Sequence, residues 1–302
     1  MDKKPSEMKT GKVMIWACLG WAMVLLLAFL YGQKLHTENV FSSRVKKEEI
    51  LSRMRVNLIK SVEMEKNAVM AITDEESKVF ADQSLKASDA VEADLRQLDL
   101  LAKAGNIAEA ANLIPEFRKG WDNLREIDKV LLEFAVQNTN LKAASLSYTK
   151  GADSVMRFER AINALSEIFA EDVRIIKPAS HALISVLKIS NLQAPHINAA
   201  GNEQMDQIES AMKTEAENVK MSLNALSEFS DERSRALLDE DRAAFAEFLA
   251  VNAEIIRLSR QNSNIKSMEL SLGRKRKAAA QCEEILSMIQ EAVRDRPFKS
   301  PR

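Results

Sequence analysis

The chain has 302 residues, of which 43 are Lys or Arg and 44 are Asp or Glu, and its formal net charge is −1. This balance argues against a nucleic-acid-binding protein, because no basic excess is present to neutralise phosphates. The 8 glycines are too few for a Rossmann or P-loop enzyme, and 2 cysteines cannot form a disulfide-rich scaffold. Abundant Ala, Leu, Glu and Lys with little Gly and Pro predict an all-α protein.

An uncharged apolar run at residues 13–31 is the first predicted element. As a helix it would cover a hydrocarbon core of about 30 Å, and Trp16, Trp21 and Tyr31 lie where interfacial aromatics anchor spanning helices. We expect one transmembrane helix at 13–31 with residues 1–12 in the cytoplasm. The protein would then be a single-pass inner-membrane protein with most of its chain periplasmic or extracellular. A cleaved signal peptide is the alternative, but no A-x-A site follows the run.

Helical periodicity continues beyond the apolar run. Thr73 and Glu76 have the spacing of a capping box, and acidic residues between them favour a helix start. The segment 104–106 (Ala-Gly-Asn) is typical of a helix end, and Pro115 marks either a kink or a new first turn. The helices predicted from these signals cover residues 34–72, residues 73–103, a segment after residue 106, and a segment that begins at residue 140.

An internal repeat is the most informative feature of the sequence. QNTNLKAASLS at 137–147 recurs as QNSNIKSMELS at 261–271, with six of eleven positions identical. The apolar register persists outside the motif, since Trp121 corresponds to Phe245 at the same spacing. The repeat predicts two antiparallel four-helix-bundle modules. Their predicted bounds are 33–167 and 168–293, followed by a disordered basic tail at 294–302.

The second copy predicts helices at 204–229, 233–260 and 264–293, with the first helix of that copy between 168 and 197. Two prolines, Pro178 and Pro195, interrupt the pattern there. The chain either turns at Pro178, which places the modules side by side, or continues as one kinked helix, which places them end to end.

No catalytic or metal-binding pattern stands out. The histidines, His36, His181 and His196, lack metal-ligand spacing, and Cys282 falls on an apolar stripe that favours a core position. No G-x-S-x-G, H-E-x-x-H or Gly-rich phosphate loop is present. We therefore expect no enzymatic activity and no cofactor or metal.

The repeated polar turns are the most distinctive candidate site residues. Asn, Ser and Thr cap helix N-termini by accepting hydrogen bonds from free amides, so capping is the favoured interpretation and ligand contact the alternative. The residues concerned are Gln137, Asn138, Asn140, Gln261, Asn262 and Asn264.

A membrane helix followed by such a bundle resembles the sensory module of methyl-accepting chemotaxis receptors. Residues 65–69 with 73–77 resemble the junction of that family's first two helices, residues 117–121 its third helix, and residues 194–197 the first junction of a second copy. The resemblance implies a tandem pair of sensory modules without the HAMP linker and cytoplasmic signalling domain. It also implies small-anion or amino-acid binding between helices, for which Arg53, Arg55 and Lys60 are the candidates.

The sequence thus predicts a membrane-anchored, chemoreceptor-like sensory protein. It would bind a small solute or a protein and modulate a signalling partner, as a homodimer or in association with a receptor. The alternative is a structural or adaptor bundle that binds no small ligand.

Overall fold

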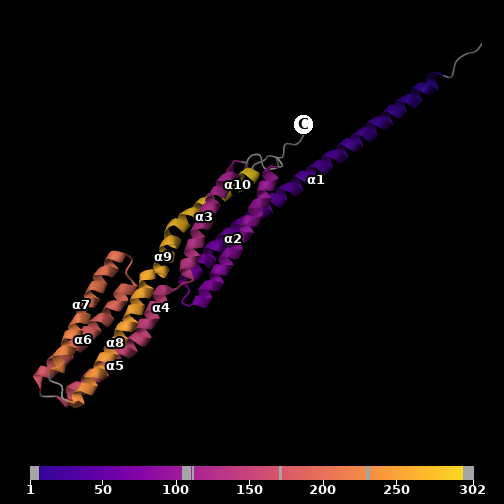
Figure 1. The fold of residues 1–302 in the computed structure, drawn as a ribbon. Helices are drawn as coiled ribbons and strands as arrows, with labels where there is room; N and C mark the ends of the chain where they lie inside the picture. Colours follow the sequence, from indigo (N-terminus) through magenta and orange to yellow (C-terminus); the bar gives the residue numbers. More distant parts are fainter. Residues whose placement is uncertain (1–6, 104–109, 111, 170–171, 229–231, 295–302) are drawn as a thin grey trace, which may run out of the picture. The chain divides into compact units, whose positions relative to one another are not determined.

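The computed structural model describes residues 7–103, 110, 112–169, 172–228 and 232–294. Within these ranges, side chains are described for all residues except 7–20, 22, 24, 35–44 and 233. All regular secondary structure in the described ranges is helical (Figure 1). The predicted all-α class is confirmed.

Helices account for almost the whole described chain, and two short π-helical segments each join two α-helices. The α-helices are α1 (Glu7–Met70), α2 (Asp74–Lys103), α3 (Leu113–Ala135), α4 (Thr139–Leu146), α5 (Ala152–Ile168), α6 (Val173–Ile197), α7 (Asn202–Ser227), α8 (Glu232–Gln261), α9 (Ser263–Leu270) and α10 (Arg276–Arg294). The π-helices are η2 (Ser147–Gly151), between α4 and α5, and η3 (Ser271–Lys275), between α9 and α10.

The start of α2 follows the predicted capping signal. The Thr73 hydroxyl accepts a hydrogen bond from the Glu76 amide at 3.2 Å. Acidic residues fill the first turn of α2, where the amide ends of the helix carry partial positive charge.

The chain turns between α5 and α6 earlier than predicted. Helix α5 ends at Ile168, and α6 begins at Val173 with Asp172 as its N-cap, because the Asp172 carboxylate accepts from the Arg174 amide at 2.9 Å. Both Pro178 and Pro195 lie inside α6. The local cap therefore decides the turn, and neither a turn at Pro178 nor one continuous kinked helix is correct.

The predicted membrane anchor is wrong. Among the described residues, no helix has an apolar stretch of the length that a bilayer crossing requires. Such a crossing needs about 20 consecutive apolar residues, and the described part of α1 provides no such stretch. Residues 13–20, 22 and 24 of the predicted span lie outside the described side chains, as does Cys18. The predicted single-pass inner-membrane location, with a cytoplasmic N-terminus, depended on this anchor and is contradicted together with it.

The chain divides into two compact units that differ from the predicted modules. The first unit comprises residues 1–59, 87–121 and 280–302, and the second comprises residues 60–86 and 122–279. The modules predicted at 33–167 and 168–293 divide the chain differently and remain a prediction, while residues 295–302 of the predicted tail lie outside the described residues.

Apart from Ala110, the buried residues of the first unit come from α1, α2, α3 and α10. The Phe117 and Trp121 rings of α3 stack with centroids 6.3 Å apart. Cys282 of α10 is buried, as its apolar stripe predicted, and its Sγ would lie 3.4 Å from a Cβ placed on Gly120. A Cβ at position 120 would therefore be in van der Waals contact with Cys282, which shows how closely α3 approaches α10 in this unit.

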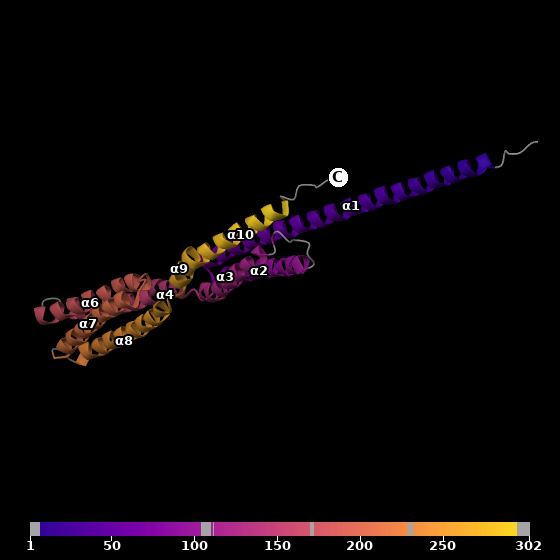
Figure 2. The same ribbon diagram turned by 90° about the horizontal axis from the view of Figure 1, so that it is seen from above.

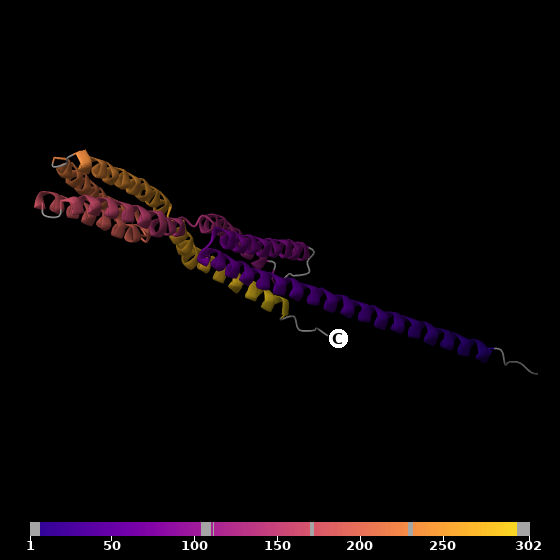
Figure 3. The same cartoon turned by 90° about the horizontal axis from the view of Figure 1, so that it is seen from below.

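The second unit contains the core formed by α5, α6, α7 and α8. Helices α6, α7 and α8 run side by side in all three views (Figures 1, 2 and 3). The centroid of the Phe245 ring of α8 lies 6.0 Å from the ring centroid of Phe158 of α5 and 6.5 Å from that of Phe248. Aliphatic side chains such as Val186 and Val219 complete this core. Its burial holds α6 against α7, and these two helices carry the candidate site.

Candidate functional site

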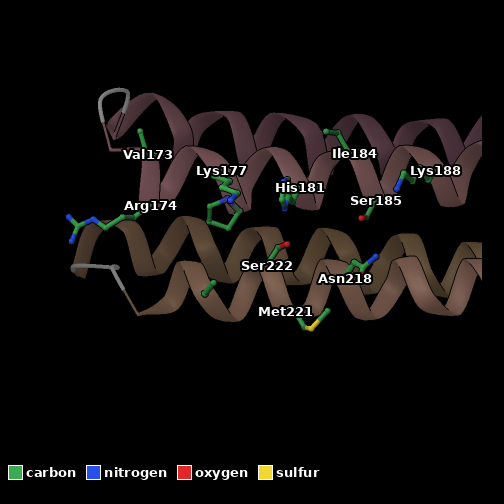
Figure 4. Close-up of a pocket in the computed structure, with 12 residues that line it drawn as sticks. Val173, Arg174, Lys177, His181, Ile184, Ser185, Lys188, Asn218, Met221 and Ser222 are labelled. Atoms are coloured by element: carbon green, nitrogen blue, oxygen red, sulfur yellow. The ribbon is translucent and has the colours of Figure 1, made fainter.

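A groove of about 790 Å³ runs between α6 and α7 in the second unit (Figure 4). This volume lies within the roughly 300–1,000 Å³ typical of small-molecule sites. The groove is lined by Val173, Arg174, Lys177, Pro178, His181, Ile184, Ser185 and Lys188 of α6, and by Asn218, Met221, Ser222 and Ala225 of α7.

The basic side chains at the two ends of the groove are already paired. Arg174 donates from Nε and Nη2 to Asp172, at 3.0 and 2.7 Å. At the other end, Lys188 donates to Glu215 at 2.9 Å. Glu215 also accepts from the Ser185 hydroxyl at 2.7 Å, and these contacts, led by that of Lys188, lower the pKa of its carboxyl. These pairs fix the ends of the groove and leave little charge there for a ligand.

The middle of the groove is different. Lys177 and His181 are exposed, and neither has a hydrogen-bond or ion-pair partner among the described residues. Figure 4 shows both side chains on α6, with Asn218 and Ser222 on the facing helix.

A lysine ammonium, an imidazole and a hydroxyl can each donate a hydrogen bond to an oxyanion, and so can the N–H of Asn218 that remains beside its 3.1 Å bond to Glu215. The exposed apolar side chains of Ile184 and Met221 border these donors. The groove therefore suits a small organic anion with an apolar portion.

A buried network at His196 connects the same two helices to α8. His196 is fully buried, with Nδ1 2.9 Å from the Ser259 hydroxyl and Nε2 2.8 Å from Glu209. Arg260 donates to the same carboxylate at 2.6 Å, and this hydrogen bond is the main reason why the pKa of Glu209 is lowered. A displacement of α6 relative to α7 would therefore disturb the contacts that both helices make with α8.

The basic residues predicted to bind a ligand do not line this groove. Arg53 of α1 donates to Asp94 at 2.7 Å and to Glu49 at 2.8 Å, and the Asp94 hydrogen bond raises the pKa of Arg53. Arg55 donates to the Ser287 hydroxyl. Lys60, the third candidate, is exposed.

The repeated turns meet each other directly in the second unit. The Thr139 amide donates to the Ser263 hydroxyl at 3.0 Å, and the Ser263 amide donates to the Thr139 hydroxyl at 3.1 Å. Likewise, the Asn140 amide donates to Asn264 Oδ1 at 3.1 Å, and the Asn264 amide donates to Asn140 Oδ1 at 3.2 Å. Each turn thus caps the helix that follows the other turn, α4 or α9.

The remaining residues of the two motifs also occupy equivalent positions. Asn138 and Asn262 have left-handed backbones, with φ of 49° and 54°, and neither side chain caps its own helix. Asn is one of the few side chains that tolerates this conformation. Gln137 and Gln261 contribute backbone carbonyls, which accept from the lysine five residues later at 2.9 and 2.8 Å.

Sequence reasoning missed the groove residues. Arg174, Lys177, His181 and Lys188 are spaced so that they share one face of α6, which is the available signal. A single basic face is also an ordinary solvated surface. Only the position of α7 opposite this face distinguishes the groove.

Comparisons with known proteins add one weak match. No protein-family model matches the chain, and no curated protein matches it. Among solved structures, it is similar to a chain of the crystal structure of the TorS sensor domain–TorT complex in the presence of TMAO, with a TM-score of 0.35 and 14% sequence identity. The match covers 85% of this chain and 98% of that chain. At this TM-score it carries no functional conclusion.

Proposed function

We propose that this protein is a non-catalytic, signal-sensing helical domain that binds a small organic anion in the α6–α7 groove. The observation that supports this function is the pair formed by Lys177 and His181, which have no partner among the described residues and share a groove with Asn218 and Ser222. If the basic residues of α6 were only part of a solvated surface, no hydrogen-bond donors would be needed opposite them on α7. The donors on both helices therefore favour a binding site.

Binding would act on the bundle through the relative position of α6 and α7. A ligand held by both helices stabilises the arrangement in which its donors converge, and a shift between two arrangements is how ligands change populations. The His196 network lies on the same helices and would carry the shift to α8. Chemotaxis-related signalling through a partner, with self-association, is the finer part of this proposal and draws on the resemblance to chemotaxis receptor modules.

The test is thermal unfolding of the full chain against carboxylates, amino acids, inorganic phosphate and polyamines at constant ionic strength. An anion at 100 times its Kd should stabilise the chain by about 2.7 kcal/mol, which corresponds to a rise in Tm of a few degrees. We expect this rise from one class of organic anion and none from polyamines.

The variant K177Q/H181Q should lose the rise in Tm and keep the Tm of the unliganded protein. Lys220→Gln is the matched control, because Lys220 is also exposed but pairs with Glu217 and does not line the groove. The proposal is wrong if no anion raises the Tm, or if K177Q/H181Q responds as the control does. A chain that binds no solute but copurifies with a protein would instead support the adaptor function.

A further inference from the structure

Three ionisable side chains from distant parts of the sequence meet in the interior of the second unit. Glu65 of α1, Asp128 of α3 and Lys275 of η3 are 0%, 3% and 1% exposed. Lys275 is the last residue of the π-helix η3. Charged groups are rarely buried to this extent unless they are paired.

The pairing in this cluster is incomplete. Lys275 Nζ donates to Asp128 Oδ1. Within the described chain, Asp128 Oδ2 has no hydrogen-bond partner, and the Glu65 carboxylate has none apart from a contact with the Ser271 hydroxyl that lowers its pKa. If all three groups are ionised, the cluster holds two negative charges and one positive charge, so one buried negative charge is uncompensated.

The corresponding place in the second copy of the repeat is neutral. Asn252 lies 124 residues after Asp128, and Gly151 lies 124 residues before Lys275. Gln193 lies beside both, because its Nε2 donates to Asn252 Oδ1 at 2.9 Å and its Oε1 would be 3.5 Å from a Cβ on Gly151.

Gln193 thus occupies the place that Glu65 has in the first copy. The Ser147 hydroxyl donates to Gln193 Oε1 at 2.6 Å, and the equivalent Ser271 lies beside Glu65. The repeat can therefore build this position with neutral, hydrogen-bonded amides. The charged version is particular to the first copy, and stability alone does not require it.

We propose that Glu65 and Asp128 form a proton-binding site in which one proton is shared between the two carboxyl groups, and that loss of this proton opens the η3 segment. Because Gln193 donates to Asn252 Oδ1 at the equivalent place, a protonated Glu65 would donate to Asp128 Oδ2, which otherwise has no partner in the described chain. The protonated Glu65, the Asp128 carboxylate and the Lys275 ammonium then sum to zero charge. Loss of the proton leaves a buried negative charge, which destabilises the closed arrangement.

The electrostatic environment supports this assignment. Burial raises the pKa of both carboxyl groups above their ordinary values, and the charge of Asp128 adds to the effect at Glu65. Lys275 only partly opposes it, as does the Ser271 hydroxyl at Glu65. The other charged groups that act on the pair are Lys66 of α1, which lowers the pKa of Glu65, and Arg125 of α3, which lowers that of Asp128. Because the pKa of these carboxyl groups is raised in the folded state, their contribution to the stability of the closed arrangement is complete at low pH. That contribution is lost as the pH rises through the folded-state pKa.

Opening should be confined to η3, because η3 supplies Lys275, which is the only cation of this cluster among the described residues. Amide hydrogen exchange of the full chain between pH 5 and pH 9, corrected for the intrinsic pH dependence of exchange, measures it. We expect protection of residues 271–276 to fall at least tenfold over this range. The equivalent η2 segment, residues 147–152, is an internal control whose surroundings are neutral and whose protection should not change.

The variant Glu65→Gln should remove the pH dependence at 271–276, because a glutamine donates to Asp128 as the protonated acid would and cannot lose a proton. Should this variant fail to fold, Asp128→Asn gives the same test from the other carboxyl group. Carboxyl ¹³C chemical shifts of the wild-type chain, assigned by the signal missing from either variant, should show a carboxyl group that titrates above the normal range. The inference is overturned if 271–276 and 147–152 respond alike to pH, or if the pH dependence persists in the variant.

Discussion

Replacing Asp241 with leucine is expected to stabilise the folded chain at pH 8 and to have a much smaller stabilising effect at pH 4. Asp241 of α8 is 0% exposed, and neither of its carboxylate oxygens has a hydrogen-bond partner in the described chain. Burial, with a smaller contribution from the charge of Glu240, raises its pKa from 3.8 to about 7. The corresponding residue in the first copy is Phe117, so an acid occupies what is an aromatic core position 124 residues earlier.

The sign and size of this effect follow from the raised pKa. An acid whose folded-state pKa exceeds its unfolded value contributes stability below the unfolded value, near pH 4, and that contribution is lost as the pH rises through 7. A difference of about three units between the folded-state and unfolded-state pKa of Asp241 corresponds to about 4 kcal/mol of unfolding free energy. Urea unfolding of wild type and Asp241→Leu at pH 4, 6 and 8 measures it.

Two further variants separate the ionisation of Asp241 from its shape. Asp241→Asn is nearly isosteric and cannot ionise, so it should also remove the pH dependence between pH 4 and 8. Asp239→Asn is the matched control, because Asp239 is exposed on the same helix beside Arg242 and should leave the curve unchanged. If Asp241→Asn destabilises the chain at pH 8, the carboxylate has a stabilising partner and the explanation fails.

Replacing Asn140 with alanine is expected to destabilise the second unit by about 2–4 kcal/mol, since several hydrogen bonds of about 1 kcal/mol each are lost together. Asn140 Nδ2 donates to Ile197 O at 2.7 Å and to Asn262 Oδ1 at 2.8 Å, and Asn140 Oδ1 accepts from the Asn264 amide. The substitution leaves that first-turn amide of α9 and two acceptors without partners in a buried region. Chemical denaturation followed by circular dichroism measures the loss.

The reciprocal geometry also predicts how substitutions combine. Asn264→Ala removes the cap from the first turn of α4, and the double variant N140A/N264A should cost less than the sum of the two single variants. Asn163→Ala on the exposed face of α5 is the control and should have little effect. Strict additivity in the double-mutant cycle would show that the two turns act independently.

Features that depend on neighbours in the sequence could be predicted from it. The all-α class followed from composition and periodicity, and the cap at Thr73 followed from residues three positions apart. The repeated turns were found by comparing the chain with itself, because identical residues recur at a fixed spacing. Local apolar character misled the prediction of a membrane anchor, since the described part of α1 contains no apolar stretch of sufficient length.

Only the tertiary structure decided which of the distant residues meet. That Asn140 and Asn264 cap each other's helices, rather than their own, depends on the packing of α4 against α9. The contact between Asp128 and Lys275, and the groove where α6 faces α7, likewise join segments that the sequence separates. A helical pattern specifies which face of a helix is buried, but it does not specify the partner of that face, because many apolar faces are equally compatible with it.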